Sequence, residues 1–377
     1  MTKIKLAKKI IRNYFIHLEK NQRKFVPGKS KIPLAFPPYG AEEVCEALDS
    51  MVNLKTTMGN KVRKFEREFA RYIGTKYSIM VNSGSSANLL ALSILTNPYL
   101  GNKRIKTGDE VITPAVTWPT TVYPISNVGA IPKFVDVNLD DFSINVDEIE
   151  NAITKKTKAV MLVHLLGNPC DMKKIKKIVK KHNLWLIEDA CEAHGAKYYQ
   201  KYVGSFGDLS TFSFFASHHI TTMEGGMVLT SNKTLYELGK SLRTFGWVRD
   251  LSSRKTLEKK YQKIDPRFLF VNMGYNFRPT ELQGAFGIHQ IKKLENLVKI
   301  RIKNATFWNK KLSPYEEFLI LPKLKKHYRK SFLFYPLTVI KNNYFSKQEL
   351  VNCLEKVGIE TRPVMAGNIL EQPVSKI

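Results

Sequence analysis

The sequence predicts an α/β fold built on a large, mostly parallel β-sheet. Apolar, β-prone stretches alternate with helical stretches between residues 77 and 190, a pattern typical of parallel strands joined by crossover helices. Polar residues follow several of these strands directly, where open α/β sheets bind ligands. The 377-residue chain can form one large and one smaller domain. We expect an N-terminal helix and linker over 1–40, a large domain over 41–295 and a small α+β domain over 296–377.

The composition is that of an ordinary globular enzyme with an excess of positive charge. Hydrophobic residues make up 43% of the chain, and no apolar run is long enough to span a bilayer. The formal net charge is +27, but the lysines are scattered rather than gathered in one patch. We therefore expect neither a nucleic acid nor a membrane as partner, and infer that the positive field favours capture of small anionic ligands.

The cysteines indicate a reducing compartment. The chain has four of them, and they form no Cys-x-x-Cys pair. They are Cys45, Cys170, Cys191 and Cys353. Unpaired thiols are typical of a cytoplasmic protein, which is the location we expect.

The N-terminal segment Met1–Phe25 is basic and carries an apolar stripe at helical spacing. The stripe consists of Ile4, Ile10, Ile11, Phe15 and Leu18. A helix docked on the rest of the protein is the favoured interpretation, and a membrane-surface helix or a transit peptide are the alternatives. The proline-rich stretch Val26–Tyr39 predicts an extended linker.

A candidate phosphate site follows the first predicted strand, Tyr77–Val81, which comes after helices expected at Ala41–Asn53 and Lys61–Tyr72. Small residues at 82–87 lead directly into the helical run Asn88–Thr96. Backbone N–H groups and hydroxyls at such a strand-to-helix junction can hold a phosphate, although a helix cap without a ligand has the same pattern.

Two further junctions carry candidate ligand contacts. Trp118 stands just beyond the strand Glu110–Thr113, and an ordinary half-buried tryptophan is its alternative interpretation. After strands at Ile131–Val135 and Ala159–His164 and a helix at Cys170–His182, the apolar strand Leu184–Ile187 runs into Glu188-Asp189. Burying a carboxylate there is costly without a cationic or donor partner, so this position predicts a bound partner.

The stretch Leu209–Thr230, LSTFSFFASHHITTMEGGMVLT, predicts two short buried strands joined by a polar loop. The loop holds two histidines, several hydroxyls, Glu224 and the pair Gly225-Gly226, which is more polar density than a turn requires. A plain surface connection is the alternative interpretation.

This loop resembles the active-site loop of the sugar aminotransferase and dehydratase family, fold-type I enzymes that use pyridoxal phosphate. Ser213-Phe214 fit the start of the family pattern and Glu224-Gly225-Gly226 its end, with Met223 in place of a usual glycine. The position of the family's cofactor-binding lysine holds His218. An imidazole there cannot bond covalently to the cofactor, but it can still move a proton.

The resemblance implies roles for other residues. Cofactor contacts are expected from Ser85, Ser86 and Ser213 on the phosphate, Trp118 stacked on the ring, Asp189 on the ring nitrogen, and Glu192 nearby. Substrate contacts are expected from His219, Arg362 and Asn368. A second family signature spans Gly274–Gln283, and in relatives the residue matching Asn276 reaches the cofactor phosphate of the neighbouring subunit. A homodimer with shared active sites is therefore implied.

The C-terminal part predicts a smaller α+β domain. A long basic helix starts near Glu295, and a strand is expected at Ser331–Ile340, a helix at Ser346–Val357 and a strand at Ile359–Arg362. Because relatives continue for several more elements, we expect the small domain to be incomplete at Ile377.

Histidine in the lysine position resembles one sub-branch, the 4-keto-6-deoxyhexose 3-dehydratases. This implies pyridoxamine and pyridoxal phosphate as cofactor, a nucleotide-sugar substrate, an amino donor such as glutamate, and His218 as a general base with a pKa near ~6.5. No cysteine lies between Glu224 and Gly274, so we expect no iron-sulfur cluster and favour the GDP-4-keto-6-deoxymannose type. A nucleotide-sugar 4-keto aminotransferase and an inactive ligand-binding relative remain the alternatives.

Overall fold

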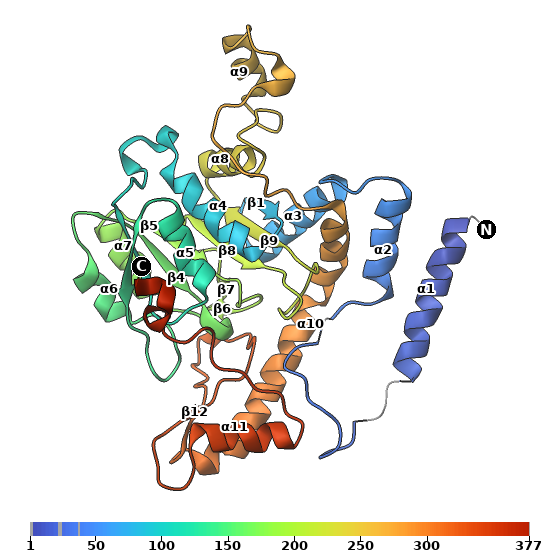
Figure 1. The fold of residues 1–377 in the computed structure, drawn as a ribbon, viewed down its shortest axis with the longest axis vertical. Helices are drawn as coiled ribbons and strands as arrows, with labels where there is room; N and C mark the ends of the chain where they lie inside the picture. Colours follow the sequence, from blue (N-terminus) through green and yellow to red (C-terminus); the bar gives the residue numbers. More distant parts are fainter. Residues whose placement is uncertain (1–2, 22–24, 37, 377) are drawn as a thin grey trace.

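A seven-stranded sheet forms the centre of the protein in the computed structural model, which describes residues 3–21, 25–36 and 38–376 (Figure 1). The strands lie in the order β1-β9-β8-β5-β4-β2-β3. They are β1 (Tyr77–Val81), β2 (Glu110–Pro114), β3 (Ile131–Val135), β4 (Thr157–Val163), β5 (Trp185–Asp189), β8 (Leu209–Ser213) and β9 (Gly226–Thr230). Only β9 runs antiparallel, to β8 on one side and β1 on the other, so the mostly parallel sheet is confirmed.

Helices cover both faces of this sheet. Alternate side chains of each strand point to opposite faces, and apolar side chains on both faces are buried beneath helices. Ile79 of β1 belongs to the core beneath one group of helices, whereas the next residue, Met80, belongs to the core beneath the other. The first group comprises α4 (Gly84–Thr96), α5 (Pro119–Asn127) and α8 (Lys233–Arg243). The second comprises α3 (Asn60–Ile73), α6 (Val146–Ala152), α7 (Met172–Lys181) and α10 (Glu281–Leu312).

Helix α10 is the longest helix among the described residues and crosses the molecule from the sheet to the small domain (Figure 1). It begins with a capping box, in which Thr280 Oγ1 accepts from Gln283 N–H at 3.3 Å and Gln283 Oε1 accepts from Thr280 N–H at 2.7 Å. The separate helix expected from Glu295 is therefore wrong, since the helix that opens at Glu281 continues without a break. The expected domain boundary at 295 falls inside it.

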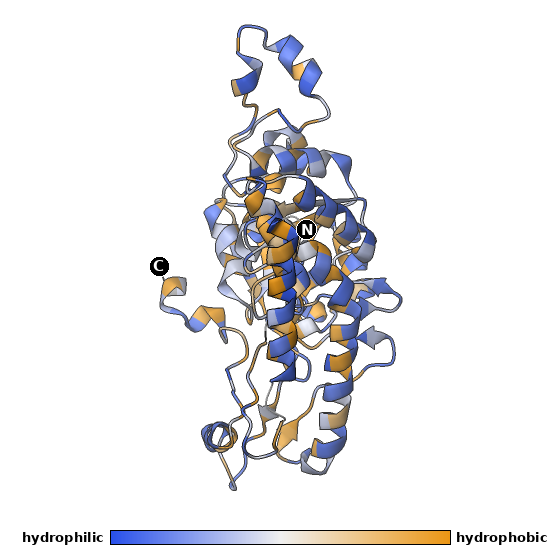
Figure 2. Ribbon diagram, turned by 90° about the vertical axis from the view of Figure 1, so that its right-hand side faces the viewer, coloured by the Kyte–Doolittle hydropathy of each residue, from blue (hydrophilic) through white to orange (hydrophobic). Residues whose placement is uncertain are grey.

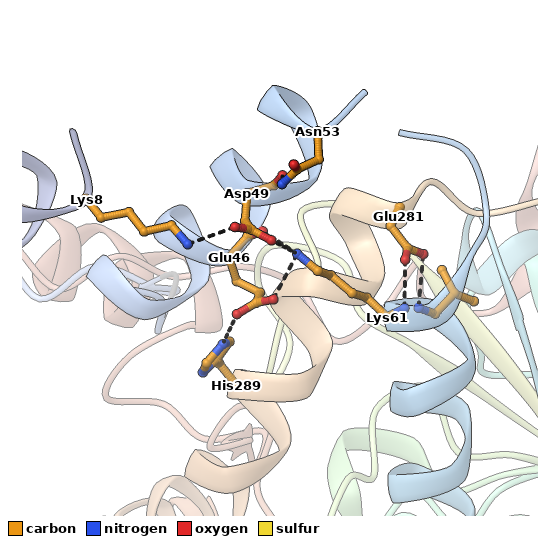
Figure 3. A network of polar contacts seen from close by, with 8 residues as sticks. Lys8, Glu46, Asp49, Asn53, Lys61, Glu281 and His289 are labelled. Atoms are coloured by element: carbon orange, nitrogen blue, oxygen red, sulfur yellow. Dashed lines mark hydrogen bonds and ion pairs between the residues drawn. The ribbon is translucent and has the colours of Figure 1, made fainter. Parts of the chain in front are cut away.

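An ion-pair network joins the N-terminal helices to α10 (Figure 3). The Lys61 ammonium lies 2.8 Å from Glu46 and 3.4 Å from Asp49, both on α2 (Ala41–Val52). Asp49 also pairs with Lys8 of α1 (Lys3–Lys20) at 3.0 Å, and Glu46 with His289 of α10 at 3.3 Å. Such partly exposed pairs each contribute little, on the order of 0–1 kcal/mol, so they orient the helices more than they stabilise them.

Helix α1 docks on α2 as expected, but the contact is shallow. None of its described side chains is fully buried, and Ile10 and Leu18 are 60% and 41% exposed. In Figure 2 the helix lies in front of the body, and its ribbon carries both hydrophilic and hydrophobic residues. No helix in the described ranges is both long and apolar enough to cross a bilayer.

The small domain has less strand than the sequence predicts. Its elements are β10 (Leu319–Ile320), β11 (Tyr328–Arg329), β12 (Thr338–Val339) and α11 (Lys347–Lys356), and β11 pairs with β6 (Lys197–Tyr198), which pairs with β7 (Lys201–Tyr202). The expected strands Ser331–Ile340 and Ile359–Arg362 are wrong apart from β12 and one isolated bridge at Ile359. The reason is that Ser331 and Leu333 donate instead to Gly167 and Leu166 of the large domain, at 3.0 and 3.1 Å.

The stretch Val248–Arg267 includes a short helix, α9 (Arg254–Lys260). It projects away from the body at the end opposite the small domain (Figure 1). None of the α9 side chains is buried.

Helix α10 approaches α3 closely at Gly287, which gives a test of the packing. A Cβ at this position would lie 2.3 Å from Cδ1 of the fully buried Phe65 ring. We expect Gly287→Ala to lower the free energy of unfolding by about 1–3 kcal/mol, although alanine is the better helix former. Urea denaturation would measure this, with the exposed Lys299→Ala on the same helix as control. Equal stability of Gly287→Ala and the unaltered protein would contradict the packing described.

Candidate active site

A buried carboxylate stands at the carboxyl end of β5, in the middle of the sheet. Asp189 is 3% exposed, and its Oδ2 accepts from Asn88 Nδ2 and Thr121 Oγ1, each at 2.8 Å. Its Oδ1 accepts from the Cys191 N–H at 3.1 Å, and Thr211 Oγ1 holds Asn88 at 2.6 Å. All these donors are neutral, and no described Lys, Arg or His forms a salt bridge with Asp189. The site therefore suits a cationic group such as a protonated pyridine nitrogen.

Four serines gather around the N-terminus of α4. Ser83 caps the helix by accepting from Ser86 N–H at 3.1 Å, and Ser85 lies exposed on the first turn. Ser213, at the end of β8, packs so close to Gly84 that a Cβ there would lie 2.5 Å from the serine Cβ. The helix N-terminus and the hydroxyls of Ser85, Ser86 and Ser213 together suit a phosphate group.

The loop between β8 and β9 is fastened to α10 at two backbone positions. Gln283 donates from Nε2 to the carbonyl oxygen of Glu224 at 2.6 Å. Gln290 accepts at Oε1 from the Thr221 N–H at 3.0 Å. Because both contacts are to the backbone, they fix the course of the loop whatever its side chains are.

At the end of the loop, two glycines pack directly against neighbouring atoms. A Cβ on Gly225 would lie 2.1 Å from Thr222 Oγ1, and one on Gly226 would lie 2.1 Å from the carbonyl oxygen of Ser83, so neither position has room for a side chain. Met223, which stands where the family has glycine, has a φ of 71°. The left-handed conformation that a glycine would supply is thus retained, at a cost of roughly 1–2 kcal/mol.

His218 lies half-buried in the same loop, and its backbone N–H donates to the carbonyl oxygen of Phe215 at 3.0 Å. Burial, followed by the charges of Arg301 and Arg362, lowers the pKa of His218 to about 4. The expected unperturbed pKa near ~6.5 is therefore wrong, because a protonated imidazole would be desolvated beside two guanidinium groups. His218 is a neutral imidazole at physiological pH.

His219 points into the protein. It is 0% exposed, and its Nε2 lies 3.0 Å from the carbonyl oxygen of Ser331, to which it must donate. Burial, together with the charge of Arg301, holds the pKa of His219 well below its ordinary value. A substrate contact by His219 would need the ring to move, whereas His218 is accessible as it stands.

Glu192 and Arg362 approach the same region from two domains. Glu192 is 5% exposed and its Oε2 accepts from the Leu166 N–H at 2.8 Å. Burial raises the pKa of Glu192 to about 8, and the charge of Asp189 adds to the effect, while Arg362 opposes it. Glu192 is thus a neutral carboxylic acid near pH 7, able to donate a hydrogen bond. Arg362 is exposed, with its guanidinium 5.4 Å from the centre of the Phe334 ring.

Trp118 and Asn368 are brought to the end of β2. Trp118 is 46% exposed and immediately precedes α5. Asn368 bridges to Val116, and Ile369 N–H donates to Ala115 O at 2.9 Å. The C-terminal segment therefore returns to the large domain beside the tryptophan. The Asn368 side chain caps the following turn by accepting from Leu370 N–H at 3.1 Å, which limits its freedom to contact a ligand.

Asn276 lies on the surface. Its Oδ1 accepts from Arg278 Nε at 3.0 Å, and its backbone bridges to Thr244. The next residue, Phe277, accepts from the Asn82 N–H at 3.0 Å, which ties this segment to the end of β1. The contact of Asn276 with a partner subunit stays a prediction.

The sequence interpretation missed three residues. Asn88 and Thr121 orient Asp189, and Asn88 could have been noticed as a polar residue opening an apolar helix. Arg301 donates from Nη1 to the carbonyl oxygens of Phe332 and Leu333, at 3.1 and 2.8 Å, and its charge acts on both loop histidines. It stands among many basic residues of α10, so no sequence signal marked it.

The charge of Arg362 gives a test of this electrostatic arrangement. A neighbouring cation disfavours the imidazolium, so Arg362→Gln should raise the pKa of His218 from about 4 toward its ordinary value. NMR titration of histidine-labelled protein without added ligand would measure the change. Arg278→Gln, at an exposed arginine that does not act on His218, is the control. An unchanged titration in Arg362→Gln would show that the arginine does not face the imidazole.

Comparisons with known proteins show the family of this chain. The DegT/DnrJ/EryC1/StrS aminotransferase family matches residues 38–376. GDP-4-keto-6-deoxy-D-mannose 3-dehydratase of Yersinia pseudotuberculosis is 39% identical over 342 residues, which is 90% of this chain and 86% of that protein. dTDP-4-dehydro-2,6-dideoxy-D-glucose 3-dehydratase of Saccharopolyspora spinosa is 38% identical over 373 residues, 96% of this chain and 80% of that protein.

A solved structure extends the similarity to the fold. The GDP-4-keto-6-deoxy-D-mannose-3-dehydratase of E. coli with bound hydrated pyridoxal phosphate superposes with a TM-score of 0.85 at 36% identity, covering 91% of this chain and 87% of that one. This confirms the expected fold of a pyridoxal-phosphate-dependent transferase. The chain belongs to the DegT/DnrJ/EryC1/StrS aminotransferase family.

Proposed function

We propose that this protein removes the 3-hydroxyl of a nucleotide-activated 4-keto-6-deoxyhexose, with pyridoxamine and pyridoxal phosphate as cofactor. The observation that carries the proposal is His218, an accessible neutral imidazole at the position where the family's aminotransferases carry a lysine. The 3-dehydratase names of its relatives support the same reaction class.

The residues around Asp189 suit this cofactor. Asp189 would hold the protonated ring nitrogen, and Trp118 would stack on the ring. The hydroxyls of Ser85, Ser86 and Ser213 would hold the phosphate. Glu192 would donate a hydrogen bond to an oxygen of the ring. When bound, pyridoxamine phosphate supplies an amine that condenses with the 4-keto group and a ring that accepts electrons.

His218 would be the general base. Its neutral imidazole can take a proton at Nε2 from the carbon that carries the cofactor amine. Because the pKa of His218 is only about 4, the imidazolium formed is a strong acid and readily returns its proton. We infer that the departing 3-hydroxyl receives this proton and leaves as water. Loss of the hydroxyl would reduce the sugar by two electrons, which the cofactor would supply as its pyridoxamine form is oxidised to the pyridoxal form. Without a lysine amine at this position to complete a transamination, hydrolysis would then release a 3-deoxy-4-keto sugar and ammonia.

The substrate and the amino donor are the partners that this reaction requires. Arg362 would contact the nucleotide phosphates and Asn368 the sugar, and the net charge of +27 favours capture of such an anion. An amino donor such as glutamate would restore the cofactor amine. Relatives carry both GDP and dTDP in their names, so the nucleotide stays open. A cytoplasmic location stays a prediction.

The reaction itself can be tested with pyridoxamine phosphate and a panel of GDP-, CDP- and dTDP-linked 4-keto-6-deoxyhexoses. We expect one of them to give a 3-deoxy-4-keto sugar and equimolar ammonia. An aminated sugar as the sole product would favour the aminotransferase alternative, and tight binding without ammonia release would favour an inactive relative.

The base assignment has its own test. His218→Asn should lower kcat by at least about 10²-fold, because it removes the proton acceptor, while cofactor affinity measured by absorbance stays within about threefold. His219→Asn is the matched comparison at the adjacent position. Loss of activity in His219→Asn alone would transfer the role of base to His219.

We further propose a homodimer in which Asn276 completes the partner subunit's phosphate site. Mixing inactive His218→Asn subunits with inactive Asn276→Ala subunits should then restore activity, because one site of each mixed dimer has both native residues. Random reassociation predicts recovery of about a quarter of the native rate. If Asn276 acted within its own subunit, every site of the mixed dimers would carry one defect and no activity would return.

A further inference from the structure

Three histidines lie together behind the active-site loop. The ring of His194, which follows β5, has its centre 6.1 Å from that of His218 and 5.5 Å from that of His219. His194 and His219 are 0% exposed. The proposed mechanism uses only His218, which leaves two fully buried imidazoles beside the proposed base without a function.

These rings carry buried polar atoms that lack partners within the described part of the chain. Both nitrogens of His194, Nδ1 of His218 and Nδ1 of His219 make no hydrogen bond, and neither does Ser331 Oγ. An unsatisfied buried polar group costs about 1–3 kcal/mol, and such groups are usually paired with an ordered water. Four such nitrogens on three neighbouring rings indicate a polar site rather than ordinary core.

The protonation states of the rings follow from their surroundings. Burial, followed by His219, His218 and Arg301, holds the pKa of His194 well below its ordinary value, so this ring is neutral like the other two. His219 donates from Nε2 to Ser331 O, and its Nδ1 is therefore an acceptor. His194, being neutral, has one acceptor nitrogen.

We propose that a buried water binds between His194, His218 and His219 and holds His218 in the tautomer that works as a base. In this arrangement Nδ1–H of His218 donates to the water, which donates to Nδ1 of His219 and to one nitrogen of His194. Three hydrogen bonds are the usual number for a buried water. Nε2 of His218 then keeps its lone pair for the substrate. The proposal rests on the proposed function of His218.

The surrounding charges make this a positioning role and not a proton store. Arg301 of α10 acts on all three rings, and Arg362 acts on His218 as well. Both cations disfavour a proton on any of the rings, so a proton taken up at His218 is not expected to rest on His194 or His219. A metal ion in place of the water is disfavoured, because the described residues contain no group of three or more ligating side chains placed to hold one.

His194→Phe is the decisive variant, because it keeps an aromatic ring among Phe212, Phe214 and Phe69 while removing both nitrogens. We expect the ¹⁵N shifts of His218 in the ligand-free protein to show loss of the Nδ1–H tautomer. With substrate, kcat should fall at least about tenfold while KM stays within about twofold. His194→Gln, which retains a hydrogen-bonding group, should recover part of both.

The matched control is Phe212→Leu, which alters the packing 5.2 Å from the centre of the His194 ring but removes no nitrogen. It should lower the melting temperature and leave the His218 tautomer unchanged. An unchanged tautomer in His194→Phe would overturn the proposal and reduce His194 to a packing residue, and so would stoichiometric Zn²⁺ binding that His194→Phe abolishes. Since the tautomer is read without substrate, failure of the proposed reaction would be seen separately.

Discussion

Two hydrogen bonds from α10 to the backbone of the β8–β9 loop hold the candidate active site in place. Gln283 and Gln290 are seven residues apart and Arg301 is eleven further on, so at about 100° per residue all three lie on one face of the helix. That face fixes the loop at Glu224 and Thr221 and turns the charge of Arg301 toward the loop histidines. Helix α10 therefore fixes the course of the loop and also packs closely against α3.

Exchanging lysine for histidine matters through the electrostatics as much as through the missing covalent bond. With Arg301 and Arg362 nearby, His218 is neutral over the whole physiological range and only weakly basic. If the phosphates of a substrate pair with Arg362, the cation that opposes protonation is neutralised, and the pKa of His218 rises on binding. His218 would then be most basic when the substrate is present, while Arg301, buried and bound to two carbonyl oxygens, keeps its effect constant.

The sequence predicted those features that depend on residues close together in the chain. The strand Tyr77–Val81 and the junction at Ser85 follow from apolar runs and small residues, and the position of Asp189 follows from a polar residue ending such a run. The segment from Ser331 pairs with Leu166 and Gly167, more than 150 residues away, so its apparent strand pattern was misleading. The lowered pKa of His218 depends likewise on Arg301, whose approach to the loop only the tertiary fold determines.

The adjacent carboxylates Glu188 and Asp189 show why one of them is suited to a ligand. Successive strand residues point to opposite faces, and a carboxylate has about four acceptor positions. Glu188 fills all four, with N–H groups at 2.8, 2.7 and 2.6 Å and His164 Nε2 at 3.0 Å. Asp189 accepts three hydrogen bonds from the described residues, two of them at Oδ2 and one at Oδ1. One position at Oδ1 therefore remains for a donor from outside the chain, and a cationic N–H would supply both the hydrogen bond and the charge that this buried carboxylate requires.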